Sequence, residues 1–449
     1  MNQGTTAELI EALPAGLSAL VERIRKEAAG RDVALYLVGG PVRDWLLRRP
    51  LRDVDLLVDP GREAEALARA AAPPESRVTL HERFGTVKLA AGEHEIDLAG
   101  ARREVYARPG ALPTVEAGEL DEDLHRRDFS VNALAIRLGA PGDRVEVIDR
   151  EDGLRDLRER RLRILHPRSF HDDPTRALRA ARLAPRLGFN LTRGSRNALR
   201  DAIRDGAFGG VSGERIRREF ERLFSDAELG LAPFEALRCL DDWHVLPALE
   251  PGLALPKEAR APLRRLGKAL AEPPWRWSRL RPLSAGLATW LAPLRPSLRR
   301  RTLERLAVRG DLAKRIAEFP KDRAGWERAL RQARGRGAVD AAVSGIDEDR
   351  LLALYAGCEA PIRRRIARWA TEDRSRRMPL TGRELTELGI EGPDVGRSLA
   401  RIRTAYLDGV LANREEALAL ARELAAGRGS RRRRGGGRAG GKGRGPSSH

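Results

Sequence analysis

LVGGPVRDWLLRRPLRDVDLLVD, residues 37–59, is the stretch that decides the fold of this 449-residue chain. It continues a buried strand (33–40) into a pair of glycines and a helix with proline at its start (41–49). A second strand (53–59) follows, in which acidic and apolar residues alternate. A strand, a helix and a strand in such close succession predict an α+β domain.

Two glycines and two aspartates give this stretch its chemistry. Side chains two apart on a strand point to one face, so we expect Asp53 and Asp55 to reach one metal cluster. Mg²⁺ prefers carboxylates together with substrate phosphates, which suits this pair. Gly39 and Gly40 let backbone N–H groups approach a triphosphate, and a helix start favours that anion. The sequence therefore predicts a Mg²⁺-dependent nucleotide site at the junction of strand and helix.

A third acid lies on a later strand of the same predicted sheet. Asp97 alternates with Glu95 in the segment HEIDLAG (94–100). Three carboxylates on neighbouring strands are what a two-metal displacement requires, because one metal activates the attacking hydroxyl and the other holds the triphosphate. Asp97 is the expected third acid, with Glu95 as the alternative.

Composition limits the remaining possibilities. The chain has 84 Lys and Arg against 65 Asp and Glu, a net charge of +19, and two cysteines, too few for a disulfide scaffold. No apolar run approaches about 18 residues, so no membrane span is expected. The acidic N-terminal segment does not resemble a signal peptide, and we expect a cytoplasmic protein with an anionic partner.

Part of the charge is concentrated at the C-terminus. Residues 428–449 hold seven Arg, one Lys and no acid, so they contribute +8 of the net +19. Gly and Arg at this density cannot form a packed core, so residues 427–449 are expected to be a disordered tail. Such a tail either adds salt-sensitive RNA affinity or serves only solubility.

Four motifs in one order resemble the class II tRNA nucleotidyltransferase and bacterial poly(A) polymerase family. They are GGPVRD…DVD, IDLAGARRE (96–104), RRDFSVNALA (126–135) and SFHDDPTRALRAARL (169–183). A weaker likeness to the C-terminal segment of these enzymes covers residues 379–417. The resemblance implies a nucleotidyltransferase head of the polymerase β type with a mixed sheet, followed by helices alone.

The expected domains follow from this resemblance and from the change to helical patterns near residue 160. They are a catalytic head (1–160), a neck with base-recognition helices (161–225), a helical RNA-binding body (226–375), a helical tRNA-binding segment (376–426) and the tail.

The resemblance implies a reaction. The family adds C, C and A from CTP and ATP to the 3′ end of tRNA without a nucleic-acid template, by two-metal attack of the 3′-hydroxyl on the α-phosphate with release of pyrophosphate. Asp53, Asp55 and Asp97 would be the catalytic, metal-binding acids. The residues implied to contact or support the nucleotide in the head are Gly39, Gly40, Arg43, Asp44, Arg127, Asp128 and Asn132.

The motif HDDPTR would select the base. In the family an acid pair and an arginine act as a protein template, and here these are Asp172, Asp173 and Arg176. A carboxylate accepts from the exocyclic amine of C or A, whereas U and G present a carbonyl there. Three-residue spacing predicts that Asp173 and Arg176 share a helix face. The family usually has Glu where this chain has Asp172, so either acid is a candidate.

Two further arginines follow the motif at helical spacing. Arg179 and Arg182 follow Arg176 at intervals of three and are expected to meet the triphosphate. Farther along, Glu214-Arg215-Ile216 resembles the family's last head-and-neck motif, which implies that it braces the nucleotide-binding helices.

Three alternatives stay open. The first is a poly(A) polymerase, although HERFGTVKLA (81–90) resembles the tRNA enzymes instead. The second is an enzyme that adds only CC or only A. The third is a non-catalytic basic RNA-binding protein, against which three clustered acids argue, since they would repel a polyanionic ligand.

Overall fold

The computed structural model describes residues 4–81, 85–106, 108–111 and 113–435, and of residues 81 and 427–435 the backbone alone. Its contacts divide the chain into two compact units. The first contains Met1–Leu223, Phe234–Ala254 and Glu304–Ala307, and the second contains Phe224–Pro233, Leu255–Leu303 and Val308–His449. The predicted head and nearly all of the predicted neck therefore belong to one unit.

A seven-stranded sheet forms the centre of the first unit. Its strands, in spatial order, are β3 (Arg77–His81), β4 (Thr86–Ala91), β5 (His94–Gly100), β2 (Asp55–Asp59), β1 (Ala34–Val38), β8 (Leu134–Arg137) and β9 (Val147–Asp149). Neighbours are antiparallel except for β2 and β5, which are parallel. This arrangement confirms the predicted mixed sheet.

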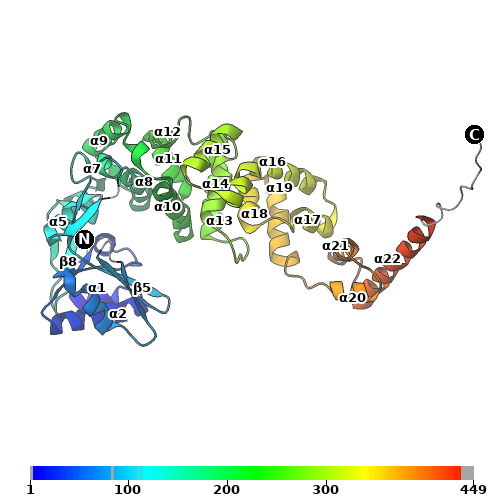
Figure 1. Ribbon diagram of the computed structural model, residues 1–449, viewed down its shortest axis with the longest axis horizontal. Helices are drawn as coiled ribbons and strands as arrows, with labels where there is room; N and C mark the ends of the chain where they lie inside the picture. Colours follow the sequence, from blue (N-terminus) through cyan, green and yellow to red (C-terminus); the bar gives the residue numbers. More distant parts are fainter. Residues whose placement is uncertain (1–3, 82–84, 107, 112, 436–449) are drawn as a thin grey trace, which may run out of the picture. The chain divides into compact units, whose positions relative to one another are not determined.

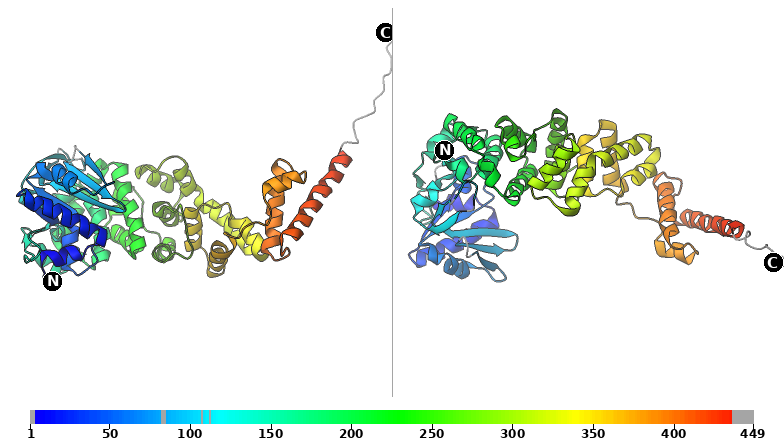
Figure 2. Two further views of the ribbon diagram at one scale, coloured as in Figure 1. Left: turned by 90° about the horizontal axis from the view of Figure 1, so that it is seen from below. Right: turned by 45° about the horizontal axis from the view of Figure 1, so that its top comes forward.

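Helices cover both faces of this sheet. On one face, α2 (Ala15–Gly30) and α4 (Ala64–Ala71) contact the sheet, as the blue helices of Figures 1 and 2 show. On the other face, Val38 and Leu57 pack against Leu124 of α5 (Leu120–His125). Asp55 lies two residues before Leu57 and therefore shares the α5 face.

The helical periodicity of residues 6–28 predicts a single helix, but the structure has two. α1 (Thr6–Glu11) ends before Pro14, and α2 begins directly after it. Proline lacks the N–H that a continuous helix needs, but its fixed φ suits the residue that precedes a helix start. The predicted helix at 41–49 is shorter, forming α3 (Gly40–Leu46).

The remaining elements near the site are short. The hairpin β6 (Arg102–Val105) and β7 (Thr114–Ala117) precedes α5. Then follow α6 (Gly153–Arg158), β10 (Arg161–Leu162), α7 (Ser169–Asp172), α8 (Thr175–Leu187), β11 (Asn190–Leu191), α9 (Arg193–Arg204), α10 (Gly213–Ser225), α11 (Pro233–Asp242) and α12 (Val245–Leu249).

Beyond residue 160, where the sequence predicted helices alone, the regular elements described are helical except for the short strands β10 and β11. The second unit contains α13 (Lys257–Ala271), α14 (Pro282–Leu291), α16 (Gly310–Gln332), α17 (Gly335–Val343), α18 (Glu348–Gly357), α19 (Ala360–Arg368), α20 (Gly382–Glu387), α21 (Pro393–Leu407) and α22 (Arg414–Gly435). It also contains α15 (Pro296–Arg305) except for the last two residues of that helix, which belong to the first unit. The last three helices of the chain, orange to red in Figure 2, share a small core that includes Leu385 and Ile402.

The C-terminal helix is longer than the sequence predicted. α22 continues to Gly435, beyond residue 427 where the disordered tail was expected to begin. Arginine is a good helix former, so the run at 431–434 can extend a helix that starts upstream. Residues 436–449 of the predicted tail, and residues 82–84 of HERFGTVKLA, lie outside the described residues. Among the helices that are described, none is long and apolar enough to cross a membrane.

Candidate active site

Parallel pairing of β2 and β5 brings two of the predicted acids side by side. Asp55 is the first residue of β2, and its partner in the register is Asp97 of β5. Asp53 is exposed in the segment directly before β2. Glu95, the alternative third acid, is instead bound to Lys88 at 2.7 Å. The register therefore favours Asp97 over Glu95.

Electrostatics show that the three acids act on one another. The Asp55 carboxyl is open to solvent but has many protein atoms around it, and this partial desolvation raises its pKa. The negative charges of Asp97 and Asp53 raise it further, while the positive charge of Arg127 opposes them. A cation placed between these acids would relieve their repulsion.

The acids fit a divalent cation that arrives with its nucleotide. Within the described residues, the buried Oδ1 atom of Asp97 has no hydrogen-bond partner. The same part of the chain contains no group of three or more His, Cys, Asp or Glu side chains that could hold a metal unaided. Mg²⁺ usually takes one or two carboxylates and completes its shell with water and substrate phosphates. Asp55 and Asp97 supply what this mode of binding requires.

Gly39 provides the turn from β1 into α3. Its φ of 77° and ψ of −131° belong to a region that only glycine adopts readily. A Cβ added here would lie 2.6 Å from Nη1 of Arg127. The absence of a side chain at Gly39 therefore lets the Arg127 guanidinium lie against the start of α3, where Gly40 is the first helical residue.

Arg43 and Asp44 lie inside the protein beneath this turn. Arg43 donates to Asp44 Oδ1 at 2.9 Å and to Asn132 Oδ1 at 2.5 Å. Arg186 of α8 donates to the other oxygen of Asp44 at 3.1 Å. Both side chains of the Arg43–Asp44 pair are buried. Direct contact with a triphosphate, which the sequence predicted, would require this network to open.

Asp128 connects the loop after α5 to α8. Its Oδ1 accepts from Asn132 at 2.8 Å, and its Oδ2 accepts from Arg179 at 2.7 Å. Burial alone would raise the pKa of Asp128, but the Arg179 charge and these hydrogen bonds outweigh it and lower the pKa. The Arg179 side chain remains 43% exposed, so its guanidinium is anchored and still accessible. Arg182 pairs with Glu219 at 3.1 Å.

The base-selection motif departs from the predicted geometry. Asp172 ends α7, and Asp173 has an extended backbone with φ −134° and ψ 92° before Pro174 and α8. The prediction that Asp173 and Arg176 share one helix face is therefore wrong. A proline disfavours helical backbone in the residue before it, and this breaks the helix at Asp173.

The two candidate acids have different surroundings. Asp173 Oδ1 accepts from the Thr175 hydroxyl at 2.6 Å and from Arg215 at 2.7 Å. Arg215 therefore braces this junction. Arg176 is buried and donates to Ser169 Oγ at 2.5 Å and to the backbone carbonyl of Arg126 at 2.7 Å.

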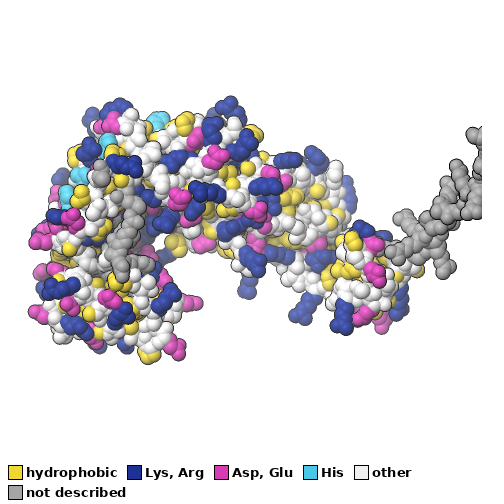
Figure 3. Space-filling view, viewed as in Figure 1, with side chains coloured by type: hydrophobic (Ala, Val, Ile, Leu, Met, Phe, Trp, Pro, Cys, Tyr) yellow, Lys and Arg dark blue, Asp and Glu magenta, His cyan; other side chains and the backbone are white. Residues whose placement is uncertain are grey.

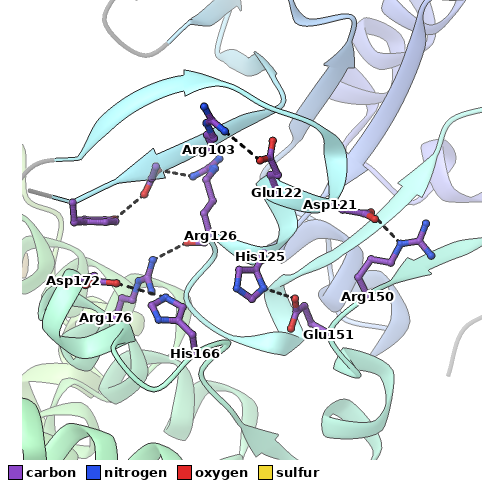
Figure 4. Close-up of a pocket in the computed structure, with 12 residues that line it drawn as sticks. Arg103, Asp121, Glu122, His125, Arg126, Arg150, Glu151, His166, Asp172 and Arg176 are labelled. Atoms are coloured by element: carbon purple, nitrogen blue, oxygen red, sulfur yellow. Dashed lines mark hydrogen bonds and ion pairs between the residues drawn. The ribbon is translucent and has the colours of Figure 1, made fainter.

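Asp172 and Arg176 line a pocket of about 620 Å³ (Figure 4). Glu104 of β6, Tyr106 directly after β6, and His166 also line the pocket. His166 Nε2 lies 3.8 Å from Asp172 Oδ2. Burial and the Arg176 charge lower the pKa of His166, so its ring is neutral near pH 7.

Sequence reasoning missed three residues of this site. Asp123 binds both Arg126 and Arg127, Glu104 binds Arg126, and Arg186 binds Asp44. A signal existed for Asp123, because it precedes the two arginines by three and four residues, the spacing of neighbours on a helix. The Glu104 and Arg186 contacts join distant segments and leave no local pattern.

Comparison with known proteins places this geometry in a family. Residues 35–163 match the Poly A polymerase head domain. The A-adding tRNA nucleotidyltransferase of Halalkalibacterium halodurans is 31% identical over 428 residues, covering 90% of this chain and 92% of that protein. The A-adding tRNA nucleotidyltransferase of Geobacter sulfurreducens is also 31% identical, over 92% of this chain but only 48% of its own length. The CC-adding tRNA nucleotidyltransferase of Deinococcus radiodurans is 41% identical over 51% of this chain and 58% of its own.

Solved structures agree with the sequence relatives. A CCA-adding enzyme in an apo form matches with a TM-score of 0.72 and 26% identity, over 95% of this chain and 100% of that chain. Complexes of a CCA-adding enzyme with CTP and with ATP match at a TM-score of 0.69 and 25% identity, over 93% of this chain and 98% and 96% of those chains.

Gly39→Ala tests the close approach of Arg127. We expect backbone strain of about 1–3 kcal/mol and a displaced Arg127, so the KM for the nucleotide should rise. Gly188→Ala is the matched control, because Gly188 also has a positive φ of 71° but an added Cβ would meet no atom within 4 Å. Steady-state kinetics on both variants would contradict this assignment if the two nucleotide KM values rose equally.

Proposed function

Because the chain belongs to the class II tRNA nucleotidyltransferase family, we propose that it adds C, A or both to the 3′ end of tRNA from CTP and ATP. The observation that carries this proposal is the pairing of Asp55 with Asp97 beside the Gly39 turn and Arg127. The relatives named for A- and CC-addition, and the similar enzymes solved with CTP and ATP, support the same substrates.

The reaction that we propose is a nucleotidyl transfer. The 3′-hydroxyl oxygen of the RNA attacks the α-phosphorus, the bond to the bridging oxygen breaks, and pyrophosphate leaves. A bound divalent cation would supply Lewis-acid activation and charge neutralisation, and Asp55 and Asp97 would hold it together with the phosphates, with the charge of Asp53 nearby. Arg127 and Arg179 orient and neutralise the triphosphate, because phosphoryl chemistry depends mainly on positioning and charge.

Selection of the base is assigned to the α7–α8 junction. Arg176 is buried and fixed by two hydrogen bonds, so its remaining N–H donors keep a defined direction toward ring acceptors. An adjacent carboxylate, from Asp172 or Asp173, accepts from the exocyclic amine that C and A share. A carbonyl at that position, as in U and G, would meet the carboxylate unfavourably.

A basic stripe on α13 offers a contact for RNA phosphates. Lys257, Arg260, Arg264 and Lys268 are exposed and recur at intervals of three and four, which places them on one helix face. Figure 3 shows Lys and Arg side chains, dark blue, over the helices of the second unit. We propose that this stripe binds the RNA backbone by charge and shape more than by sequence.

Addition of A alone is the second candidate. It is favoured by the two A-adding relatives, whose alignments cover 90% or more of this chain.

Three tRNA substrates, ending before C74, after C74 and after C75, test the function and assign the subtype. Each is incubated with Mg²⁺ and one labelled nucleotide at a time. We expect short incorporation of C, of A or of both, and none of U or G, because the proposed base site accepts only amine-bearing bases. Long A tails would point to a poly(A) polymerase, and no incorporation from any nucleotide would refute the enzyme.

Asp55→Asn is the control that links this activity to the acid pair. It removes one charge without changing shape, and we expect the rate to fall by about 100-fold or more while tRNA binding persists. Asp59→Asn is its match, since Asp59 is an exposed acid at the other end of β2. Equal activity of the two variants would contradict the assigned role of Asp55.

Arg176→Ala tests the protein template. We expect either misincorporation of UTP and GTP or collapse of activity, since ring acceptors lose their donor. Asp172→Asn and Asp173→Asn, assayed with the same four nucleotides, identify the acid that reads the base. Unchanged selectivity in the Arg176 variant would exclude it from base reading.

The double variant Arg260→Ala/Lys268→Ala tests the α13 stripe. We expect tRNA affinity to fall about tenfold and the slope of log affinity against log salt to lose about one unit per phosphate contact. Filter binding at several salt concentrations measures both. Arg238→Ala is the control, because Arg238 is already paired with Glu235 and Asp242. A salt slope equal to that of the wild type would refute the stripe.

A further inference from the structure

A single buried carboxylate divides its two oxygens between consecutive arginines. Asp123 Oδ1 accepts from Arg126 at 2.9 and 2.6 Å, and Oδ2 accepts from Arg127 at 2.9 Å. Asp123 is only 1% exposed. Rotation of this carboxylate would break contacts on both sides, so its orientation sets that of both guanidinium groups.

Only part of the Arg127 guanidinium group is hydrogen-bonded within the described residues. Its Nη2 is bound to Asp123, while its buried Nε has no hydrogen-bond partner among the described residues. Its Nη1 lies against Gly39, and its charge opposes the raised pKa of Asp55. A buried N–H donor without an acceptor is costly, and a phosphate oxygen at this position would satisfy it.

A second carboxylate keeps Asp123 in place. Arg126 Nη1 donates to Glu104 Oε1 at 2.8 Å, and the other oxygen of Glu104 accepts from the Tyr106 hydroxyl at 2.7 Å. Arg126, labelled in Figure 4, lines the same pocket as Asp172 and Arg176. Glu104 of β6 therefore fixes the Arg126 side chain. Because Asp123 binds this fixed side chain, its carboxylate is held in the orientation in which it also binds Arg127.

The negative charge of Asp123 stabilises the positions of Arg126 and Arg127. Burial alone would raise the pKa of Asp123, but Arg127 and Arg126 outweigh it and lower the pKa, so the carboxylate is ionised at neutral pH. Without that negative charge, Arg126 would keep Glu104 as a partner, whereas Arg127 would lose the carboxylate that accepts from its Nη2. Arg127 is therefore the group expected to move.

We propose that Asp123 is the positioning residue that aims Arg127 at the nucleotide triphosphate, with Glu104 supporting it through Arg126. This inference rests on the proposed function for the identity of the ligand. In this proposal Asp123 does not contact the substrate, because both of its carboxylate oxygens accept hydrogen bonds from arginine side chains.

Asp123→Asn tests the proposal by binding as well as by turnover. An ATP analogue with a methylene bridge between its α- and β-phosphates reports nucleotide affinity without reaction. We expect its Kd, and the KM for CTP or ATP, to rise about tenfold, as for loss of one well-aligned charged hydrogen bond. The KM for tRNA should not change. A variant that merely misfolds in part would lower kcat and leave both KM values as they were.

A double-mutant cycle separates positioning from other effects. In an Arg127→Ala background, Asp123→Asn should add no further loss of analogue affinity. An equal loss in both backgrounds would overturn the proposal. Glu104→Gln, farther along the chain of contacts, should give a smaller rise, about two- to threefold, and keeps the test available if Asp123→Asn does not fold.

Asp340→Asn is the matched control. Asp340 is also buried and holds Arg403 through both oxygens, but it lies in the second unit. It should lower stability without changing analogue affinity. If wild-type protein binds the analogue but incorporates nothing, the proposed function fails while the Asp123 assignment is still decided by binding. If wild-type protein is active and Asp123→Asn binds the analogue normally, only the Asp123 assignment fails.

Discussion

A chain of charged and polar side chains, buried except at its two ends, holds the candidate active site together, and both of its ends belong to one helix. It begins at Arg186 of α8, crosses to α3, passes through the loop after α5 and returns to α8. Its members, in order of contact, are Arg186, Asp44, Arg43, Asn132, Asp128 and Arg179. Helix α8 thereby fixes the Gly39 turn and the Arg127–Asp128 loop at once.

Such a network is stable only when it is complete. Transferring a charge from water to a protein interior costs several kcal/mol, and only a partner in good geometry offsets this. Loss of Asp44 would leave Arg43 and Arg186 without their shared carboxylate, and loss of Asn132 would separate Arg43 from Asp128. The loop position is therefore tied to every contact in the network. Because α8 also carries Arg176, the proposed base site and the proposed phosphate site are fixed to the same helix.

The sequence predicted the parts of this site that depend on local periodicity. The pairing of Asp55 with Asp97 agrees with the predicted third acid, whereas Asp53, predicted on the same strand as Asp55, lies before β2. The sequence did not predict that Arg43 would be buried, because its role is set by Asn132, 89 residues away. The three-residue spacing also failed to predict the position of Asp173, because Pro174 ends the helical geometry there. Contacts between residues far apart in the sequence determine the orientation of these side chains, and the spacing of residues along the sequence cannot reveal such contacts.

Two buried side-chain atoms without a hydrogen-bond partner in the described part of the chain, one an acceptor and one a donor, lie among the proposed site residues. Asp97 Oδ1 is a buried acceptor, and Arg127 Nε is a buried donor, and neither has a partner among the described residues. Each costs the folded protein about 1–3 kcal/mol if left unpaired. A phosphate group with its accompanying cation offers an acceptor to the arginine and a positive charge to the carboxylate. Binding of that pair would recover both penalties, so the network that fixes these two side chains also favours the nucleotide with its cation over either component alone.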